Sequence, residues 1–225
     1  METIVISVGG SLIVPGEIDV DFLKSFKDLI SNYVESKKFV IITGGGKVSR
    51  KYQEAAKALG IVNSEDLDWL GIHGTRLNAH LFRTIFREHA NPKIVKDPTE
   101  EIDFNEAILI ACGWKPGWST DYDATLLAAN VNAAKLVNLT NVDYVYDKDP
   151  KEHSDAKPIK ETTWSEFRKL LPEDWNPGLN APFDPVAAKE AEMMGIEVAI
   201  INGKNLDELK NYLDGKSFEG TIIKQ

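Results

Sequence analysis

Short apolar runs recur along the chain and are separated by longer stretches of mixed polarity. Five of these runs are candidate strands: Ile4–Val8, Phe39–Thr43, Ala107–Ala111, Lys135–Leu139 and Ile196–Ile201. Runs that are apolar on both faces are typical of strands in a parallel sheet whose two faces are covered by helices. The pattern therefore predicts a mainly parallel central sheet.

The stretch between the first two runs has the periodicity of an amphipathic helix. Its apolar side chains recur at three- and four-residue intervals and are Phe22, Leu23, Phe26, Leu29, Ile30 and Tyr33. A stripe of this kind is usually buried against a neighbouring element. Because candidate strands and helices alternate along the chain, the sequence predicts an α/β sandwich.

Three later segments begin with residues that favour a helix N-terminus. They are Thr163 with Glu166, Asn205 with Glu208, and Asp184 with Pro185. The first two pairs match the capping box, and the third places a capping carboxylate before a proline that suits the first helical turn. Met193 and Met194 are predicted to pack in the core on the helix that starts near Asp184. Two segments are predicted loops: the polar segment 147–160 and the proline-rich segment 171–185.

Composition and charge narrow the class of protein. The 225 residues are 43% hydrophobic and 27% charged, which is enough for one domain with a substantial core. A formal net charge of -9 argues against nonspecific binding to nucleic acid or to anionic lipid. Cys112 is the only cysteine, so no intramolecular disulfide can form. No apolar run reaches the ~20 residues of a membrane span. We expect a cytoplasmic protein with neither a nucleic-acid nor a membrane partner.

Glycine clusters directly follow the first two candidate strands, as Gly9-Gly10-Ser11 and as Gly44-Gly45-Gly46-Lys47. In a parallel sheet these positions open at the carboxyl edge, where ligands bind. Glycines there let backbone N–H groups approach a phosphate, and a following helix adds its positive N-terminal end. A tight turn explains either cluster alone, but two after neighbouring strands favour a phosphate site. Neither cluster matches the P-loop or the dinucleotide fingerprint.

A third segment of this character, 112–121, follows another candidate strand and precedes a predicted apolar helix. Its last three residues carry two hydroxyls and a carboxylate at the predicted helix start, where N-capping is the simplest role. Two tryptophans, Trp114 and Trp118, are unusual in a plain connector. Their aromatic faces can cover a planar base or shield a cleft.

Several short blocks, each weak alone, form a specific set. They are Val8–Ser11, Thr43–Tyr52, Leu67–Ile72, Thr75–Ala79, Pro116–Asp121, Thr140–Asp143, Tyr146, Asp149–Pro150 and Asp184–Lys189. In this order along the chain they resemble the amino acid kinase family and, more narrowly, its archaeal-type uridylate kinases.

The resemblance implies a three-layer α/β/α sandwich that forms one domain, 1–225, with an acceptor lobe at about 1–120 and an ATP lobe at about 121–225. It also implies transfer of the γ-phosphoryl group of ATP to UMP, which gives UDP and ADP in pyrimidine nucleotide synthesis. Mg²⁺ is expected to arrive with ATP, without direct side-chain ligation. The expected assembly is a homo-oligomer, a hexamer built from dimers.

The resemblance further implies ligand roles, residue by residue. ATP would be bound by Gly9, Gly10, Ser11, Gly46, Arg50, Thr140, Asn141, Tyr146 and Asp149. UMP would be bound by Gly45, Asp68, Arg76, Trp114, Lys115, Pro116, Gly117, Trp118, Ser119 and Thr120. The candidate catalytic groups are Lys47, Arg50 and Asp121.

The chemistry of phosphoryl transfer agrees with these roles. The reaction needs in-line placement of the phosphates and neutralisation of charge on the equatorial oxygens. Backbone amides, Mg²⁺ and the cations Lys47, Arg50 and Arg76 can supply both, and an acceptor phosphate needs no general base. Each of these cations could instead be a solvated charge on a helix. Asp121 either caps its helix or orients Mg²⁺ or a cationic side chain.

Two positions depart from the wider family. Many members carry a lysine two residues before the first glycine, where this chain has Ser7. Archaeal-type uridylate kinases also tend to lack this lysine, which makes Lys47 the candidate for the main cation. Tyr144 stands where relatives often have glycine and can reshape the ATP pocket. Two alternatives remain open: a kinase for a carboxylate, carbamate or other phosphate acceptor, and a noncatalytic nucleotide-binding module.

Overall fold

The structure, a computed structural model, describes residues 1–150, 152–171 and 181–225. Its strands are β1 (Glu2–Val8), β2 (Lys37–Thr43), β3 (Ala90–Val95), β4 (Ile108–Ala111), β5 (Lys135–Thr140), β6 (Val145–Tyr146), β7 (Pro158–Ile159), β8 (Glu161–Thr163), β9 (Glu197–Asn202) and β10 (Thr221–Lys224). Its helices are α1 (Gly10–Ile13), α2 (Val20–Ser31), α3 (Gly46–Ala58), α4 (Ser64–Ile85), α5 (Thr120–Asn130), α6 (Trp164–Arg168), α7 (Pro185–Met194) and α8 (Leu206–Leu213).

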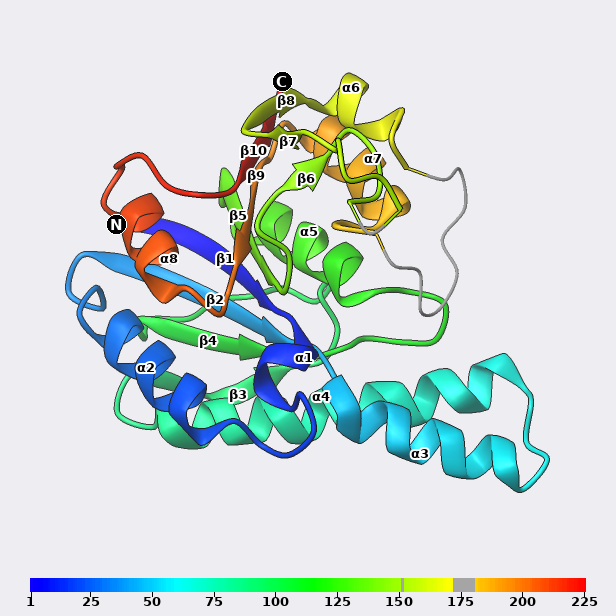
Figure 1. The fold of residues 1–225 in the computed structure, drawn as a ribbon. Coiled ribbons are helices and arrows are strands. Elements are labelled where there is room, and N and C mark those ends of the chain that lie inside the picture. The colour runs from blue at the N-terminus through cyan, green and yellow to red at the C-terminus, as the bar shows by residue number, and fades with distance from the viewer. Residues whose placement is uncertain (151, 172–180) are drawn as a thin grey trace.

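One sheet runs through the molecule, in the order β3-β4-β2-β1-β5-β9-β10-β8 (Figure 1). The strands from β3 to β9 pair in parallel, whereas β10 runs antiparallel to β9. The five predicted strands correspond to β1, β2, β4, β5 and β9. The prediction of a mainly parallel α/β sandwich is therefore confirmed.

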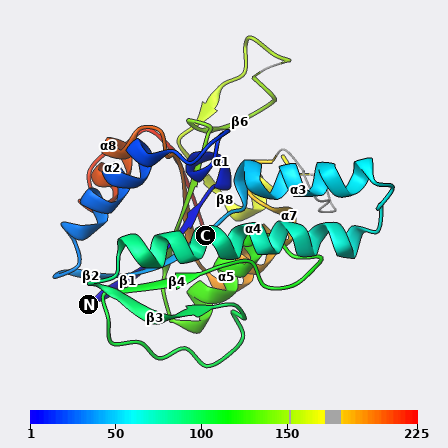
Figure 2. The same cartoon turned by 90° about the horizontal axis from the view of Figure 1, so that it is seen from below.

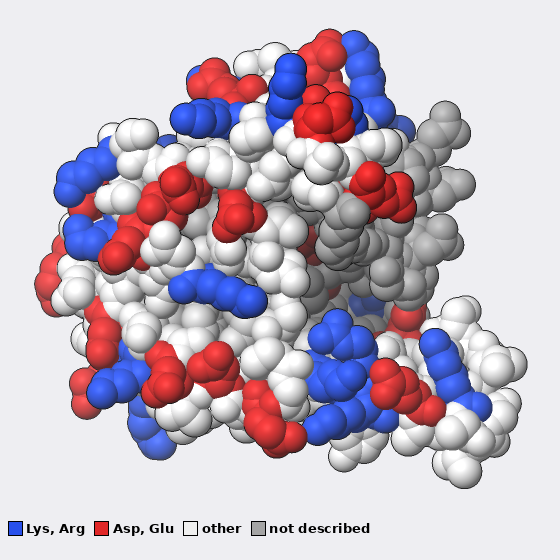
Figure 3. Space-filling model, viewed as in Figure 1, with Lys and Arg blue, Asp and Glu red and all other residues white. Residues whose placement is uncertain are grey.

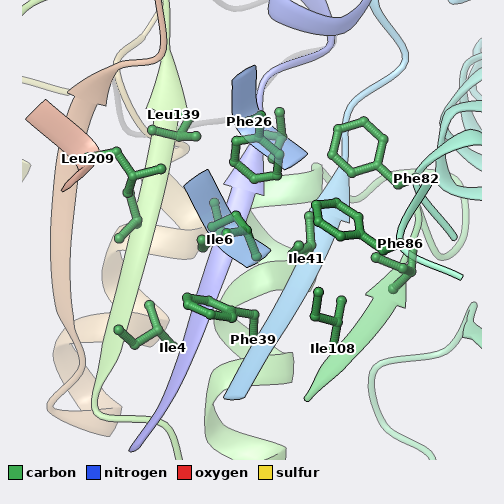
Figure 4. Close-up of a cluster of buried hydrophobic side chains, with 14 of the residues drawn as sticks. Ile4, Ile6, Phe26, Phe39, Ile41, Phe82, Phe86, Ile108, Leu139 and Leu209 are labelled. Atoms are coloured by element: carbon green, nitrogen blue, oxygen red, sulfur yellow. The ribbon is translucent and has the colours of Figure 1, made fainter. Parts of the chain in front are cut away.

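Helices cover both faces of the sheet because side chains alternate between them along each strand. On β1, Ile4 and Ile6 belong to one buried cluster, and Val5 belongs to the other. Helices α2, α4 and α8 contribute to the first cluster, whose phenylalanines lie over β1 and β2 (Figure 4). Helices α5, α6 and α7 cover the opposite face. The result is the predicted three-layer arrangement.

Two of the three predicted helix caps are confirmed, and the third is wrong. Asp184 caps α7 by accepting hydrogen bonds from the N–H groups of Val186 (2.6 Å) and Ala187 (2.9 Å), and Thr163 caps α6. The capping box predicted at Asn205 is wrong, because the Asn205 side chain makes no capping bond. The Glu208 carboxylate instead accepts a hydrogen bond from the Glu219 N–H, 2.7 Å away.

Other predictions also needed correction. Met193 and Met194 are exposed, because α7 buries its alanine face, including Ala187 and Ala191, against the sheet. Within the predicted loop 147–160, β7 pairs with β6 in a small antiparallel ribbon. Residues 151 and 172–180 of the two predicted loops lie outside the described residues.

Helices α3 and α4 form an antiparallel hairpin that extends well beyond the end of the sheet (Figures 1 and 2). The C-terminal half of α4 packs on the core through Phe82, which is fully buried. The part of the hairpin that extends past the sheet exposes apolar side chains, including Tyr52, Leu59 and Val62. No helix in the described ranges is both long and apolar enough to cross a bilayer.

Candidate active site

The two glycine turns meet at the carboxyl ends of the paired strands β1 and β2. A Cβ on Gly10 would lie 2.7 Å from the Gly45 nitrogen, and a Cβ on Gly44 would lie 2.5 Å from the Gly10 nitrogen. These separations are too short for any side chain, so glycine is required for the two backbones to touch. The turns therefore form a single backbone surface with no side chains over it at these positions.

Hydrogen bonds fix the orientation of this surface. The Gly9 N–H donates to the Leu139 carbonyl and the Gly44 N–H donates to the Val8 carbonyl, each at 2.9 Å. From α4, the buried Asn78 side chain donates to the Gly44 carbonyl at 2.8 Å. With these groups paired, the second glycine turn is held to both the sheet and α4. Sequence reasoning assigned no role to Asn78.

Helix α3 begins at this surface without a side-chain cap. Gly46, its first residue, has a left-handed backbone with φ of +64°. Lys47 is half-buried and Arg50 is exposed, and neither forms an ion pair within the part of the chain that the structure describes. Figure 3 shows Lys and Arg side chains gathered over the start of α3. A helix N-terminus with nearby cations is a favourable site for a phosphate group.

Asp121, in the first turn of α5, points back at the sheet. One of its carboxylate oxygens accepts a hydrogen bond from the Ser7 hydroxyl at 3.4 Å, and the other accepts from the Asp184 N–H at 3.2 Å. Burial, and next the neighbouring Asp184 carboxylate, raise the pKa of Asp121 to about 7. Capping is performed by Ser119, whose hydroxyl accepts from the Tyr122 N–H at 3.1 Å. Asp121 is thus not the cap of α5.

Residues 112–118, which we call the acceptor loop, lie between α4 and α5. From α4, Asp68 accepts a hydrogen bond from the Gly117 N–H at 2.9 Å, and Arg76 donates to the Trp114 carbonyl at 3.3 Å. The Arg76 guanidinium also lies 5.6 Å from the Trp69 ring centre. The structure therefore brings Asp68 and Arg76 to the acceptor loop, as the sequence blocks suggest. Their contact with a substrate stays a prediction.

The loop also contacts α5. The buried Asp123 carboxylate accepts a hydrogen bond from the Trp114 N–H at 3.0 Å, and the Tyr122 ring stacks on Trp118 with centres 4.2 Å apart. Lys115 places its ammonium 3.7 Å from the Trp114 ring centre. Sequence reasoning missed Tyr122 and Asp123, although the four-residue spacing of Trp118 and Tyr122 at a helix start was a usable signal.

The predicted ATP residues of the second half of the chain line one cavity of about 550 Å³. Thr140 and Asn141 lie at the end of β5, and Tyr146 and Asp149 belong to the segment that follows. Tyr144 lines the same cavity, with its ring centre 6.4 Å from that of Tyr146. The cavity adjoins the first glycine turn through the hydrogen bond from Gly9 to the end of β5.

Asp123 gives a prediction for stability. Burial raises its pKa from 3.8 to about 7, so the folded protein retains a proton that the unfolded chain releases between about pH 4 and pH 7. The contribution of Asp123 to folding stability therefore falls as the pH rises through this window. The change Asp123→Asn is expected to raise the melting temperature, relative to the unsubstituted protein, more at pH 8 than at pH 5.

Circular dichroism melts at both pH values would test this expectation. Asp21→Asn, which removes an exposed carboxylate from α2, controls for the loss of one surface charge. An equal shift of the Asp123→Asn melting temperature at pH 5 and pH 8 would contradict the raised pKa.

Comparison with known proteins places these features in a family. Residues 2–202 match the family model described as the amino acid kinase family. A uridylate kinase of Thermococcus kodakarensis is 36% identical over 223 residues, which cover 98% of each chain. A uridylate kinase of Thermoplasma volcanium is 35% identical over 227 residues, which cover 100% of this chain and 98% of that one.

Solved structures are similar over the same length. The uridylate kinase from Archaeoglobus fulgidus superposes with a TM-score of 0.83 at 29% identity, covering 99% of this chain and 100% of that one. The UMP kinase from Ureaplasma parvum has a TM-score of 0.79 at 20% identity, covering 100% and 99%, which is a likeness of fold.

Proposed function

The chain belongs to the amino acid kinase family, and from this premise we propose that it is a uridylate kinase. It transfers the γ-phosphoryl group of ATP to UMP and gives UDP and ADP. The observation that carries the proposal is the contact between the two glycine turns, which follow β1 and β2. In the sheet these strands lie between β5, whose end borders the cavity, and β4, which the acceptor loop follows. The near full-length similarity to archaeal uridylate kinases supports the choice of acceptor.

The donor side is built from the first glycine turn and the cavity. Gly9, Gly10 and Ser11 receive the ATP phosphates, with Gly46 and Arg50 on the far side of them. The adenine and ribose occupy the cavity lined by Thr140, Asn141, Tyr146 and Asp149. A ligand whose base lies in that cavity directs its phosphates toward the start of α3, where positive charge gathers. In this proposal residues 121–225 are the ATP lobe and 1–120 the acceptor lobe, whose glycine turns and Arg50 also reach the ATP phosphates.

The acceptor side is built from the second glycine turn and the acceptor loop. Gly45 contacts the phosphate of UMP, and Asp68 holds its ribose or uracil side. Arg76 steadies the acceptor phosphate, and residues 114–120 wrap the nucleotide. In the structure Asp68 accepts a hydrogen bond from the Gly117 N–H, and it would exchange this partner for the nucleotide.

Catalysis follows from placement and charge. The acceptor phosphate oxygen is itself the nucleophile, and the protein holds it in line with the γ-phosphorus of ATP. Lys47, Arg50 and the backbone N–H groups of the turns stabilise the negative charge on the transferred group. Asp121, the carboxylate among the catalytic candidates, would orient Mg²⁺ or a cationic side chain without direct ligation of the metal. Mg²⁺ arriving with ATP would neutralise phosphate charge. The protein works in the cytoplasm, in pyrimidine nucleotide synthesis.

Phosphorus NMR of parallel reaction mixtures tests the proposal against its alternatives. With ATP, Mg²⁺ and UMP, the γ-phosphate signal of ATP is expected to be replaced by the β-phosphate signal of UDP. Glutamate and carbamate, tested in parallel, should yield no acyl phosphate. Consumption of ATP with either of them, and none with UMP, would indicate the carboxylate or carbamate kinase. ATP binding without turnover of any acceptor would indicate the noncatalytic module.

The α3–α4 hairpin supports the proposed homo-oligomer, a hexamer built from dimers. Tyr52 and Leu77 are 64% and 61% exposed on this hairpin, and exposed apolar side chains favour association. The double change Tyr52→Glu and Leu77→Glu is expected to lower the assembly mass toward the 25.0 kDa of one chain. Light scattering after gel filtration measures it, with Met193→Glu as an exposed apolar control on α7. A monomeric unsubstituted protein would contradict the proposal.

A further inference from the structure

The first turn of α5 holds two residues that neither the proposed chemistry nor the helix itself requires. Ser119 already caps the helix, and Asp121 faces Ser7 on the sheet. Tyr122 and Asp123 point elsewhere, toward the acceptor loop. Each contacts a different tryptophan of that loop.

Asp123 holds the backbone of Trp114. The residue is 1% exposed, and one carboxylate oxygen accepts the Trp114 N–H at 3.0 Å. The other oxygen is buried and has no hydrogen-bond partner within the described ranges. A buried carboxylate with one unpaired oxygen destabilises the fold, and a neutral acceptor could take the same N–H at lower cost. Fold stability therefore does not explain this carboxylate.

Tyr122 holds the side chain of Trp118. The two rings are nearly parallel, at 19°, with centres 4.2 Å apart. Trp114 lies beside Trp118, with ring centres 6.4 Å apart and planes at 24°. One helical turn thus fixes the first tryptophan through its backbone and the second through its ring.

The loop needs such contacts, because its own sequence leaves it free. Gly117 has φ of +88° and no neighbour within 4 Å of its Cβ position, so the backbone there has the full freedom of glycine. On the α4 side the start of the loop is held by Thr75, whose hydroxyl oxygen accepts the Gly113 N–H at 2.9 Å. Farther along, α4 holds it through Asp68 and Arg76, both of which are expected to engage the substrate. Between Trp114 and Trp118, the contacts from α5 remain when Asp68 and Arg76 turn to the ligand.

We propose that Tyr122 and Asp123 are positioning residues of the acceptor site, which hold the loop in its binding conformation before UMP arrives. Without them, UMP would have to order the loop as it binds. The apparent affinity for UMP would then be the intrinsic affinity multiplied by the fraction of protein whose loop is already ordered. Donor binding and the transfer step would change little. The inference rests on the proposed function, since UMP is the acceptor considered.

Steady-state kinetics on four variants tests the inference. Asp123→Ala and Tyr122→Ala are each expected to raise KM for UMP about tenfold, while kcat and KM for ATP stay within about twofold. Asp123→Asn keeps an oxygen for the Trp114 N–H, and Tyr122→Phe keeps the stacked ring. Both conservative variants should therefore retain KM for UMP near the unsubstituted value.

A matched control lies at the other end of the same helix. The Asn130 side chain donates to the carbonyls of Pro98 at 2.8 Å and Glu100 at 2.7 Å, so Asn130→Ala also cuts a tie between α5 and a loop. It should lower stability and leave KM for UMP unchanged. Hydrogen exchange of residues 113–118 in the ligand-free protein should speed up in Tyr122→Ala but not in Asn130→Ala.

The outcomes separate the inference from the function on which it rests. An unsubstituted protein that does not phosphorylate UMP would overturn the proposed function, and the inference with it. If the protein is active, two results would overturn the inference alone. In one, the alanine variants keep the unsubstituted KM for UMP; in the other, kcat falls and the KM values for UMP and ATP rise to the same extent. Tyr122 is only partly buried, so its variants are expected to fold. They therefore test the inference even if Asp123→Ala folds poorly.

Discussion

Replacing Gly46 with alanine is expected to abolish phosphoryl transfer, lowering kcat/KM by about three orders of magnitude. Gly46 has φ of +64°, which an alanine adopts only with strain, and its Cβ would overlap the Gly10 carbonyl oxygen and lie 2.8 Å from the Gly10 carbonyl carbon. The contact is between two backbones, so no side-chain movement can relieve it. The two turns would have to separate, and the N–H groups proposed to bind the phosphates would lose their common orientation.

Gly60→Ala is the matched control for this change. Gly60 also has a positive φ, +86°, but nothing lies within 4 Å of its Cβ position. The strain of about 1 to 2 kcal/mol is therefore reproduced without the steric overlap. Gly60→Ala should lower the melting temperature and preserve kcat/KM. If both variants lost the same activity, the close contact between the turns would not be what the site requires.

Removing the charge of Lys47 is expected to lower kcat about a hundredfold, with KM for ATP changed only a few-fold. Ser7 occupies the strand position where many family members have a lysine, and its hydroxyl is directed at Asp121. The candidate for this role is Lys47, at the start of α3 beside the second glycine turn. A cation that interacts mainly with the transferred group stabilises the transition state more than the bound ATP.

Lys51→Ala supplies the comparison on the same helix. The Lys51 ammonium is already paired with Glu17 at 3.1 Å, and the side chain is exposed, so its loss should leave kcat nearly unchanged. Equal losses in kcat and in ATP affinity for Lys47→Ala would assign Lys47 to ground-state binding of ATP. An unchanged kcat would leave Arg50 as the candidate.

The sheet was predictable because its central strands are buried on both faces and carry apolar residues throughout. The strand β3 was missed for a physical reason. It is at the edge of the sheet and contains Asn91, Pro92 and Lys93, which break the apolar pattern. The edge strand β8, with the sequence Glu161–Thr163, lacks the pattern for the same reason. Apolar runs mark strands that are buried along their whole length, and neither edge strand is buried throughout.

The glycine turns and the position of the acceptor loop were also predictable, since each directly follows a buried strand. The contacts between them were not. Asn78 reaches a carbonyl 34 residues away, and Asp68 reaches an N–H 49 residues away. Such pairs are created by the hairpin of α3 and α4, whose path no local pattern specifies. The roles of the site residues toward ATP and UMP remain predictions that rest on the family resemblance.

Competition among acceptors in one reaction is the sharpest test of whether the protein is a uridylate kinase. Purified protein, ATP and Mg²⁺ would be mixed with equal concentrations of UMP, CMP, dUMP and AMP, and the diphosphates would be separated and quantified at low conversion. UDP is predicted as the dominant product, because Asp68 and the acceptor loop are proposed to bind UMP. Diphosphates formed in comparable amounts, or no diphosphate from a protein that binds ATP, would contradict it.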